Sequence, residues 1–186
     1  MRKCLTLITF AFLFAPISTM AVEKGGITMP DTLQAGGETL TLNGAGIRSK
    51  FVFNLYIAGL YLIDKSSNAA AIIKSSDPMA IRLHIVSSLI SSEKMSKATR
   101  EGFEKSTNGN TAPISAEIDQ FIGAFSEPIK EDDVFEFVNT TNGVVVTKNG
   151  TEKATISSSE FKQALFGIWL SDHPVQAKLK KGMLGK

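Results

Sequence analysis

The sequence has 186 residues, of which 43% are hydrophobic and 20% are charged, and its formal net charge is +2. A charge this close to zero excludes the strongly basic surface with which proteins bind nucleic acids, so no nucleic-acid partner is expected. The only cysteine is Cys4, which excludes a disulfide within the chain and a metal site built from several cysteines.

The first 21 residues have the pattern of a secretory signal peptide. Arg2 and Lys3 give a basic start, residues 5–17 are almost entirely apolar, and the small residues Thr19 and Ala21 precede a cut after Ala21. No apolar run approaches the roughly 18 residues of a membrane span. We therefore expect residues 1–21 to be removed, residues 22–186 to form a single domain, and the protein to be periplasmic or secreted. Two of the 20 basic residues lie in this segment, which leaves 18 against 18 acidic residues.

The segment that follows predicts strands. Residues 27–29 and 39–42 alternate between apolar and polar side chains, and Gly36-Gly37 marks a turn between them. The Asn-Gly-Ala-Gly run at 43–46 predicts a second break. The aromatic and β-branched residues from Lys50 to Ile63 then predict one long strand, with Ala58-Gly59 as a candidate bulge.

Helical patterns dominate the middle of the chain. A short helix is expected near residues 68–74, followed by an alternating strand at 79–86 in which Arg82 and His84 occupy the solvated face. Two amphipathic helices are predicted to begin near Ser92 and Ser115, because their apolar residues recur at helical spacing. These apolar stripes are expected to face a core.

The last third of the chain predicts three strands and then two helices. The strands are expected at 134–138, 143–147 and 152–156, joined by hairpin turns at Asn142-Gly143 and Asn149-Gly150. Ser157 and Glu160 predict the start of a helix with a broad apolar face, and a final helix follows Pro174. Strands followed by helices, twice over, favour an α+β fold.

Few residues have the chemistry or spacing of a catalytic or metal site. His84 and His173 have no neighbouring ligands at metal-binding spacing, so neither a metal nor a cofactor is expected. Arg48 remains, next to the strand that holds Tyr56 and Tyr61. A guanidinium and a phenol hydroxyl together suit an anionic or enolate oxygen. The alternative is an exposed arginine at the start of a strand and two tyrosines in the core.

Three blocks of sequence, at residues 43–62, 94–103 and 161–180, occur in the same order as in a known family. Together they resemble the chalcone isomerase-like family, and the last block resembles its bacterial exported branch. The resemblance covers about residues 25–186. It implies an open-faced β-sandwich, in which a layer of helices covers one face of a long antiparallel sheet and a ligand cleft lies between them.

The resemblance also implies roles for single residues. Plant members cyclise chalcones to flavanones, whereas related plastid members bind fatty acids through an arginine and a tyrosine. Arg48 resembles the family arginine, and Tyr56 falls where the enzymes have a catalytic threonine and the fatty-acid binders a tyrosine. On the central helix, the enzymes' Tyr, Lys and Asn positions read Lys94, Lys97 and Glu101 here, so only the lysine matches.

This departure favours a non-catalytic binder of a small apolar acid such as a fatty acid, with Arg48, Tyr56, Tyr61 and Lys97 as ligand-binding residues and no residue assigned to catalysis. One alternative is an isomerase or intramolecular lyase acting on an α,β-unsaturated ketone, with Arg48 as electrophile and Tyr56 or Lys97 as acid or base. The other is an envelope structural or interaction protein with a filled cleft. Along one unbroken strand, Arg48 and Tyr56 share a face and Arg48 is expected to donate to the phenol oxygen. Tyr61 falls on the other face of the strand, and only a bulge at Ala58-Gly59 would place it on the same face as Arg48 and Tyr56.

Overall fold

The computed structural model describes residues 22–186, and the predicted signal peptide lies outside this range. The strands are β1 (Val22–Lys24), β2 (Ile27–Met29), β3 (Thr32–Ala35), β4 (Glu38–Lys50), β5 (Phe53–Leu62), β6 (Met79–Ile85), β7 (Val134–Thr140), β8 (Gly143–Lys148) and β9 (Thr151–Ile156). The helices are α1 (Ala69–Lys74), α2 (Ser92–Ser106), the 3-10 turn η1 (Ala112–Ile114), α3 (Ser115–Gly123), α4 (Ser159–Leu170) and α5 (Ala177–Met183). None of the helices described is long and apolar enough to cross a membrane.

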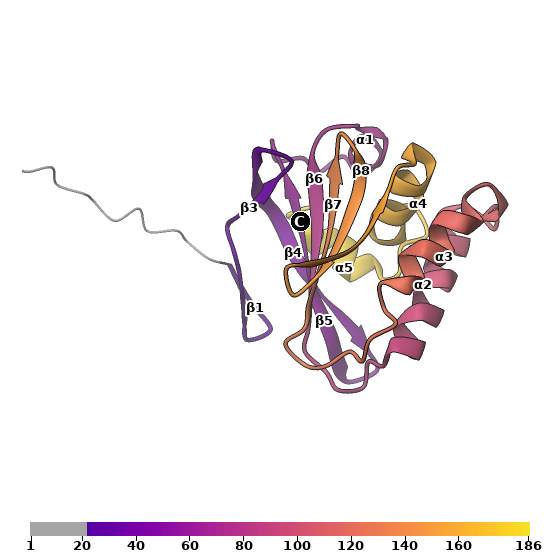
Figure 1. Cartoon of the computed structure of the whole chain (residues 1–186). Coiled ribbons are helices and arrows are strands. Elements are labelled where there is room, and N and C mark those ends of the chain that lie inside the picture. Colours follow the sequence, from indigo (N-terminus) through magenta and orange to yellow (C-terminus); the bar gives the residue numbers. More distant parts are fainter. Residues whose placement is uncertain (1–21) are drawn as a thin grey trace, which may run out of the picture.

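Strands β3 to β9 form one antiparallel sheet in which each strand pairs with the next along the chain, while β1 and β2 form a separate hairpin. Helices α2, α3 and α4 lie together on one side of this sheet (Figure 1). The predicted α+β fold, a long antiparallel sheet covered on one face by helices, is confirmed. The large core lies between these two layers, because the apolar residues of each strand alternate toward the helices.

Local signals position the helices largely as predicted. Asn68 caps α1 by accepting from the backbone N–H of Ala71, and Ser91 caps α2 by accepting from that of Lys94. The prediction that Ser157 caps α4 is wrong by one residue, since Ser158 accepts from the backbone N–H of Phe161. Ser157 donates instead to the backbone oxygen of Asn142, which ties the start of α4 to the β7–β8 turn.

The predicted break at residues 43–46 is wrong, because these residues lie inside β4. Their glycines make room for α5 rather than a turn. A Cβ atom at Gly44 would lie 2.3 Å from the carbonyl oxygen of Gly182, and one at Gly46 would lie 2.9 Å from that of Leu179. Real Cβ atoms do not approach this closely, so only glycine lets the strand and helix backbones meet here.

The single long strand predicted from Lys50 to Ile63 is also wrong. Lys50 ends β4 and pairs with Phe53, so Phe51 and Val52 form a two-residue turn between β4 and β5. The bulge lies at Leu55 rather than at 58–59, because Arg48 pairs with Tyr56 while the next pair joins residues 49 and 54. A bulge changes the direction in which neighbouring side chains point, and this one lies beside the cavity described below.

Candidate functional site

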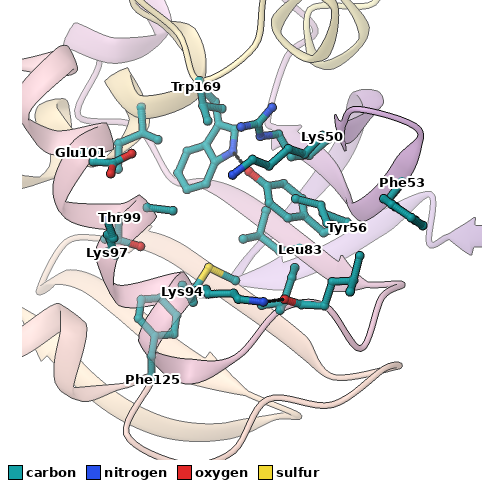
Figure 2. Close-up of a pocket in the computed structure, with 18 of the residues that line it drawn as sticks. Lys50, Phe53, Tyr56, Leu83, Lys94, Lys97, Thr99, Glu101, Phe125 and Trp169 are labelled. Atoms are coloured by element: carbon teal, nitrogen blue, oxygen red, sulfur yellow. Dashed lines mark hydrogen bonds between the residues drawn. The ribbon is translucent and has the colours of Figure 1, made fainter.

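A cavity of about 590 Å³ lies between the sheet and the helices, with strands β4 to β7 on one side and α2, α3 and α4 on the other (Figure 2). Pockets that hold small organic ligands measure roughly 300–1,000 Å³. The cleft predicted between the two layers is therefore present. Side chains do not fill this cleft, so the structure does not support the alternative of a structural protein with a filled cleft.

The inner part of the cavity is apolar. Its lining comes from both layers and consists of buried residues that include Tyr56, Leu83, Met95, Phe125, Phe137 and Trp169. These side chains offer a ligand an apolar surface, with the Tyr56 hydroxyl and the Trp169 indole N–H as polar atoms. An apolar lining with few polar groups is typical of a site for an apolar ligand with one polar end.

The outer part of the cavity is cationic. Lys50, at the end of β4, and Lys94 and Lys97, on α2, are exposed residues that line the opening together with the partly buried Arg48. Glu101 is the acidic residue of the lining. Four positive side chains against one negative side chain give the opening a positive potential, which attracts an anion.

Arg48 is held in place by the chain around it. Its Nη1 atom donates to the backbone oxygen of Ser49 at 2.9 Å and to Oε1 of Gln176 at 3.4 Å. Gln176 precedes α5 and also accepts from the backbone N–H of Ser49 at 3.1 Å, so it ties the start of this helix to β4. Within residues 22–186, Arg48 forms no ion pair with a carboxylate. A guanidinium has five N–H donors, so it retains donors for a ligand.

Tyr56 is the cross-strand partner of Arg48, and both side chains line the cavity. Its hydroxyl oxygen accepts from Nε1 of Trp169 at 3.2 Å (Figure 2). Burial raises the pKa of Tyr56 above its ordinary value, while the Trp169 hydrogen bond and the Arg48 charge act in the opposite direction. The hydroxyl is therefore protonated at neutral pH. Because its oxygen already accepts from the indole, the phenol can donate its proton to a ligand.

Two details of the predicted site change. Trp169, not Arg48, donates to the Tyr56 hydroxyl. Tyr61 does not line the cavity, because it lies in the smaller core on the opposite face of the sheet, with Met29 and Leu40. There its hydroxyl donates to the backbone oxygen of Pro30 at 2.9 Å. The odd separation of 56 and 61, with no bulge between them, places the two tyrosines on opposite faces.

Arg48 and Tyr56 do share a face, as predicted, although for a different reason. They face each other across an antiparallel hairpin and do not follow one another along a single strand. Lys97 lines the opening from α2, as do the two other family positions of that helix, Lys94 and Glu101. The structure thus brings together three of the four predicted ligand-binding residues.

Sequence reasoning missed Trp169 and Lys50 as residues of the cavity. The sequence pattern places Trp169 on the apolar face of a helix, but α4 is buried on nearly all sides. A helix of this kind contacts more than one surface. Lys50 begins the long strand predicted from the sequence, because nothing in Phe51-Val52 predicts a turn. Aromatic and β-branched residues favour strands, so the sequence holds no local signal for the tight connection after Lys50.

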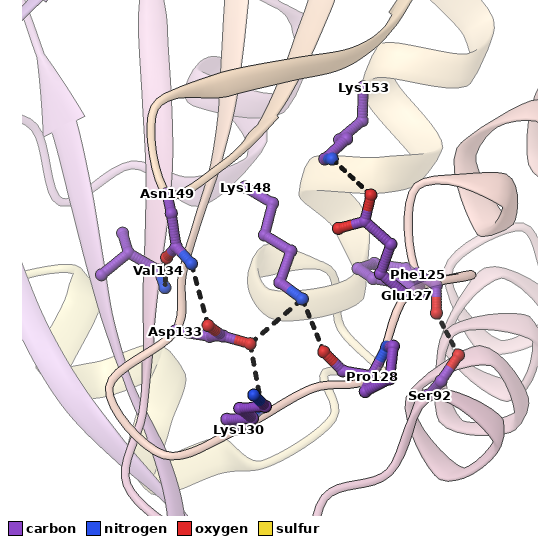
Figure 3. A network of polar contacts seen from close by, with 10 residues as sticks. All are labelled: Ser92, Phe125, Glu127, Pro128, Lys130, Asp133, Val134, Lys148, Asn149 and Lys153. Atoms are coloured by element: carbon purple, nitrogen blue, oxygen red, sulfur yellow. Dashed lines mark hydrogen bonds and ion pairs between the residues drawn. The ribbon is translucent and has the colours of Figure 1, made fainter.

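A polar network joins the loop between α3 and β7 to β8 (Figure 3). Nζ of Lys148 donates to the backbone oxygen of Pro128 at 2.7 Å and lies 3.1 Å from Oδ2 of Asp133. Burial alone would raise the pKa of Asp133, but hydrogen bonds from the Asn149 amide, the Lys130 N–H and Lys148 hold it below its ordinary value. The loop from α3 to β7 is thereby anchored to β8, and this loop contains the cavity residue Phe125.

Among residues 22–186, no group of three His, Cys, Asp or Glu side chains is arranged to hold a metal ion.

The chain matches the model of the family described as chalcone isomerase-like over residues 21–185. No curated protein matches it. Among solved structures it is similar to a fatty-acid binding protein of Arabidopsis thaliana, with a TM-score of 0.69 and 13% sequence identity over 88% of this chain and 95% of that one. An identity this low shows a shared fold alone. Since the family model covers almost all of the sequence, the chain belongs to the chalcone isomerase-like family.

Proposed function

We propose that this protein belongs to the bacterial exported branch of its family and is a non-catalytic binder of a small apolar acid such as a fatty acid. One observation supports this most strongly. A guanidinium without a carboxylate partner and a phenol with a free proton, Arg48 and Tyr56, lie side by side at the wall of an apolar cavity.

The chemistry of the two ends of the cavity matches the two ends of such a ligand. A carboxylate would accept from the Arg48 guanidinium and from the Tyr56 hydroxyl, both of which are suited to hydrogen bonds of about 2.7–2.9 Å with a charged oxygen. The alkyl chain would lie against Leu83, Phe125 and Phe137. The lysines at the opening would attract the anion before it enters. The likeness in fold to a fatty-acid binding protein adds to this proposal.

Palmitate and hexadecanol, which share a chain length and differ in the head group, provide the test. Trp169 is the only tryptophan in the sequence and lines the cavity, so its fluorescence reports occupancy directly. Delipidated protein should bind palmitate at least about 30-fold more tightly than hexadecanol, because only palmitate forms the charge-assisted bonds. Equal affinities, or no fluorescence change with either compound, would contradict the proposal.

The non-catalytic part rests on the residues where the plant enzymes have a tyrosine and an asparagine. Lys94 and Glu101 occupy these positions at the opening, so the groups that would organise a chalcone and its water are absent there. We expect no loss of chalcone absorbance above the uncatalysed rate at neutral pH. A loss proportional to protein concentration that yields one flavanone enantiomer would assign the isomerase function instead.

Export rests on the pattern of residues 1–21. Expression of the full chain in a bacterial host, followed by separation of the periplasm from the cytoplasm, should give a protein whose first residue is Val22. Replacing Ala21 with a bulky residue such as Tyr should block the cut. An uncut chain confined to the cytoplasm would contradict export but leave the binding proposal untouched.

A further inference from the structure

The tip of the β4–β5 hairpin is a conspicuous apolar surface. Phe51 is 90% exposed, Val52 is 87% exposed and Phe53 is 53% exposed, whereas the other exposed large apolar residues of the described chain do not exceed 44%. This hairpin extends at one end of the sheet, near the start of α2 (Figure 1). Three consecutive exposed apolar residues are costly in water, and patches of this kind mark interaction sites.

A two-residue hairpin turn needs a positive φ, and at this tip an aromatic residue adopts it. Phe51 has a φ of +54°, a conformation that suits glycine or asparagine and disfavours a bulky side chain. At other hairpins of this chain, Gly25, Gly36 and Asn149 occupy the turn positions with positive φ. An aromatic residue therefore stands where glycine or asparagine would make the hairpin more stable. Strain of this kind points to a function for the side chain.

The tip adjoins the opening of the cavity. Phe51 and Phe53 line the cavity on the strand side, and Leu89, which is 44% exposed, lines it from the loop before α2. Figure 2 shows Lys50 and Phe53 on the strand side of the opening and Lys97 on the helix side. Apolar side chains thus project at the same end of the molecule as the cationic residues Lys50, Lys94 and Lys97.

We infer that Phe51, Val52 and Phe53 form a docking tip that inserts into a lipid bilayer containing anionic phospholipids. Aromatic and aliphatic side chains enter the boundary between headgroups and acyl chains, and neighbouring lysines bind the anionic headgroups. No carboxylate within residues 22–186 forms an ion pair with Lys50, Lys94 or Lys97, so these charges are available to headgroups.

This orientation would present the opening of the cavity to the bilayer surface. If the protein binds fatty acids as proposed above, the acid could then pass between bilayer and cavity without crossing bulk water. Only this last step rests on the proposed function, because docking depends on the tip and the lysines alone.

Vesicle flotation with residues 22–186 tests the inference. The protein should float with vesicles of phosphatidylcholine and phosphatidylglycerol, bind vesicles of phosphatidylcholine alone more weakly, and lose binding as salt is raised. Val52→Glu should weaken partitioning at least about tenfold, because it replaces an inserted apolar group with a negative charge. Val52 does not line the cavity, so palmitate affinity in solution should stay the same in this variant.

Phe51→Asn separates loss of docking from loss of folding. Asparagine tolerates a positive φ, so the thermal midpoint should stay the same or rise while vesicle binding falls at least about tenfold. Ile63→Asn is the matched control, since Ile63 follows the opposite end of β5 and is 42% exposed. This control should keep vesicle binding unchanged.

Equal flotation of Phe51→Asn, Ile63→Asn and unmodified protein would overturn the inference. Failure of the unmodified protein to float would also overturn it. If light scattering then showed a dimer that Phe51→Asn abolishes, the tip would be assigned to binding a second copy of the chain. Vesicle binding without palmitate binding would refute the proposed function and leave docking in place.

Discussion

Lys148 and Arg48 are both cations on strands of the same sheet, but their surroundings differ. Lys148 is 7% exposed, lies 3.1 Å from the Asp133 carboxylate and donates to the backbone oxygen of Pro128, outside the cavity lining (Figure 3). Arg48 lines the cavity itself and contacts only neutral acceptors, the backbone oxygen of Ser49 and the side chain of Gln176.

This contrast separates structural charges from charges kept for a ligand. A buried charge is costly unless an opposite charge and hydrogen bonds surround it, which is the case for Lys148. Arg48 lacks such a partner beside an apolar cavity, so an external anion would complete its surroundings. Lys162 is also structural, although its acceptors are neutral: its ammonium donates to the carbonyls of Ile72, Ile73 and Ser75, which leaves none of its three N–H donors for a ligand. These differences predict which substitutions change stability and which change binding.

The largest effect is expected for Lys148→Met. This change leaves the Asp133 carboxylate buried without its cation, and breaking one side of a buried pair costs about 3 kcal/mol of unfolding free energy or more. For a chain of this size the thermal midpoint should fall by about 6–12 °C. Urea unfolding measures the change, and Lys178→Met, at an exposed position on α5, is the control. A midpoint unchanged in Lys148→Met would show that the network has no structural role.

Arg48→Met should weaken ligand binding and leave stability almost unchanged. Loss of one partner of a desolvated charge pair costs about 2 kcal/mol of binding or more, so the Kd for palmitate should rise at least about 30-fold. The unfolding free energy should change by less than about 0.5 kcal/mol, since Arg48 has no ion pair to lose.

Arg100→Met is the matched control for that experiment. It removes the same charge from α2 at an exposed ion pair with Asp119, outside the cavity lining. Its palmitate affinity should stay within about twofold of the unmodified protein, because exposed charges are screened by solvent. Equal weakening by Arg48→Met and Arg100→Met would assign the effect to general charge rather than to the site.

The stability of the fold in acid should depend on the Asp133 carboxylate rather than on the residues that line the cavity. Its pKa is lower in the folded protein than the ordinary value of 3.8. The stabilising contribution is therefore complete above the pKa of the unfolded chain and is lost as the pH falls through the lower folded pKa. The difference in unfolding free energy between the unmodified protein and Asp133→Asn should be largest near neutral pH and shrink in acid. A difference that grows on acidification would contradict this assignment.

Tyr56→Phe should have the smallest effect. It should change both stability and ligand binding, because the Tyr56 hydroxyl has both a structural partner and a free donor. Its hydroxyl accepts from the Trp169 indole and is free to donate to a ligand. Losing one hydrogen bond of this kind typically costs about 1 kcal/mol. Unfolding free energy should fall by about that amount, and palmitate affinity by about fivefold. An effect on stability alone would remove Tyr56 from the site.

Much of the fold could be predicted from the sequence, because its signals are local. The caps at Asn68 and Ser91 and the turn at Asn149-Gly150 each satisfy or free backbone groups within a few residues. The alternation in β6 likewise predicted which side chains face the helices. The pairing of Arg48 with Tyr56 in one site came from the family resemblance.

Only the tertiary structure decided what lies between the layers. Gly44 and Gly46 looked like a turn, but their meaning comes from α5, which is more than 100 residues away in the chain and whose backbone approaches them closely. The hydrogen bond from Trp169 to Tyr56, the placement of Tyr61 on the opposite face and the unpaired charge of Arg48 likewise depend on contacts between distant segments. Local patterns determine which elements form, whereas the packing of one element against another determines which side chains share a cavity.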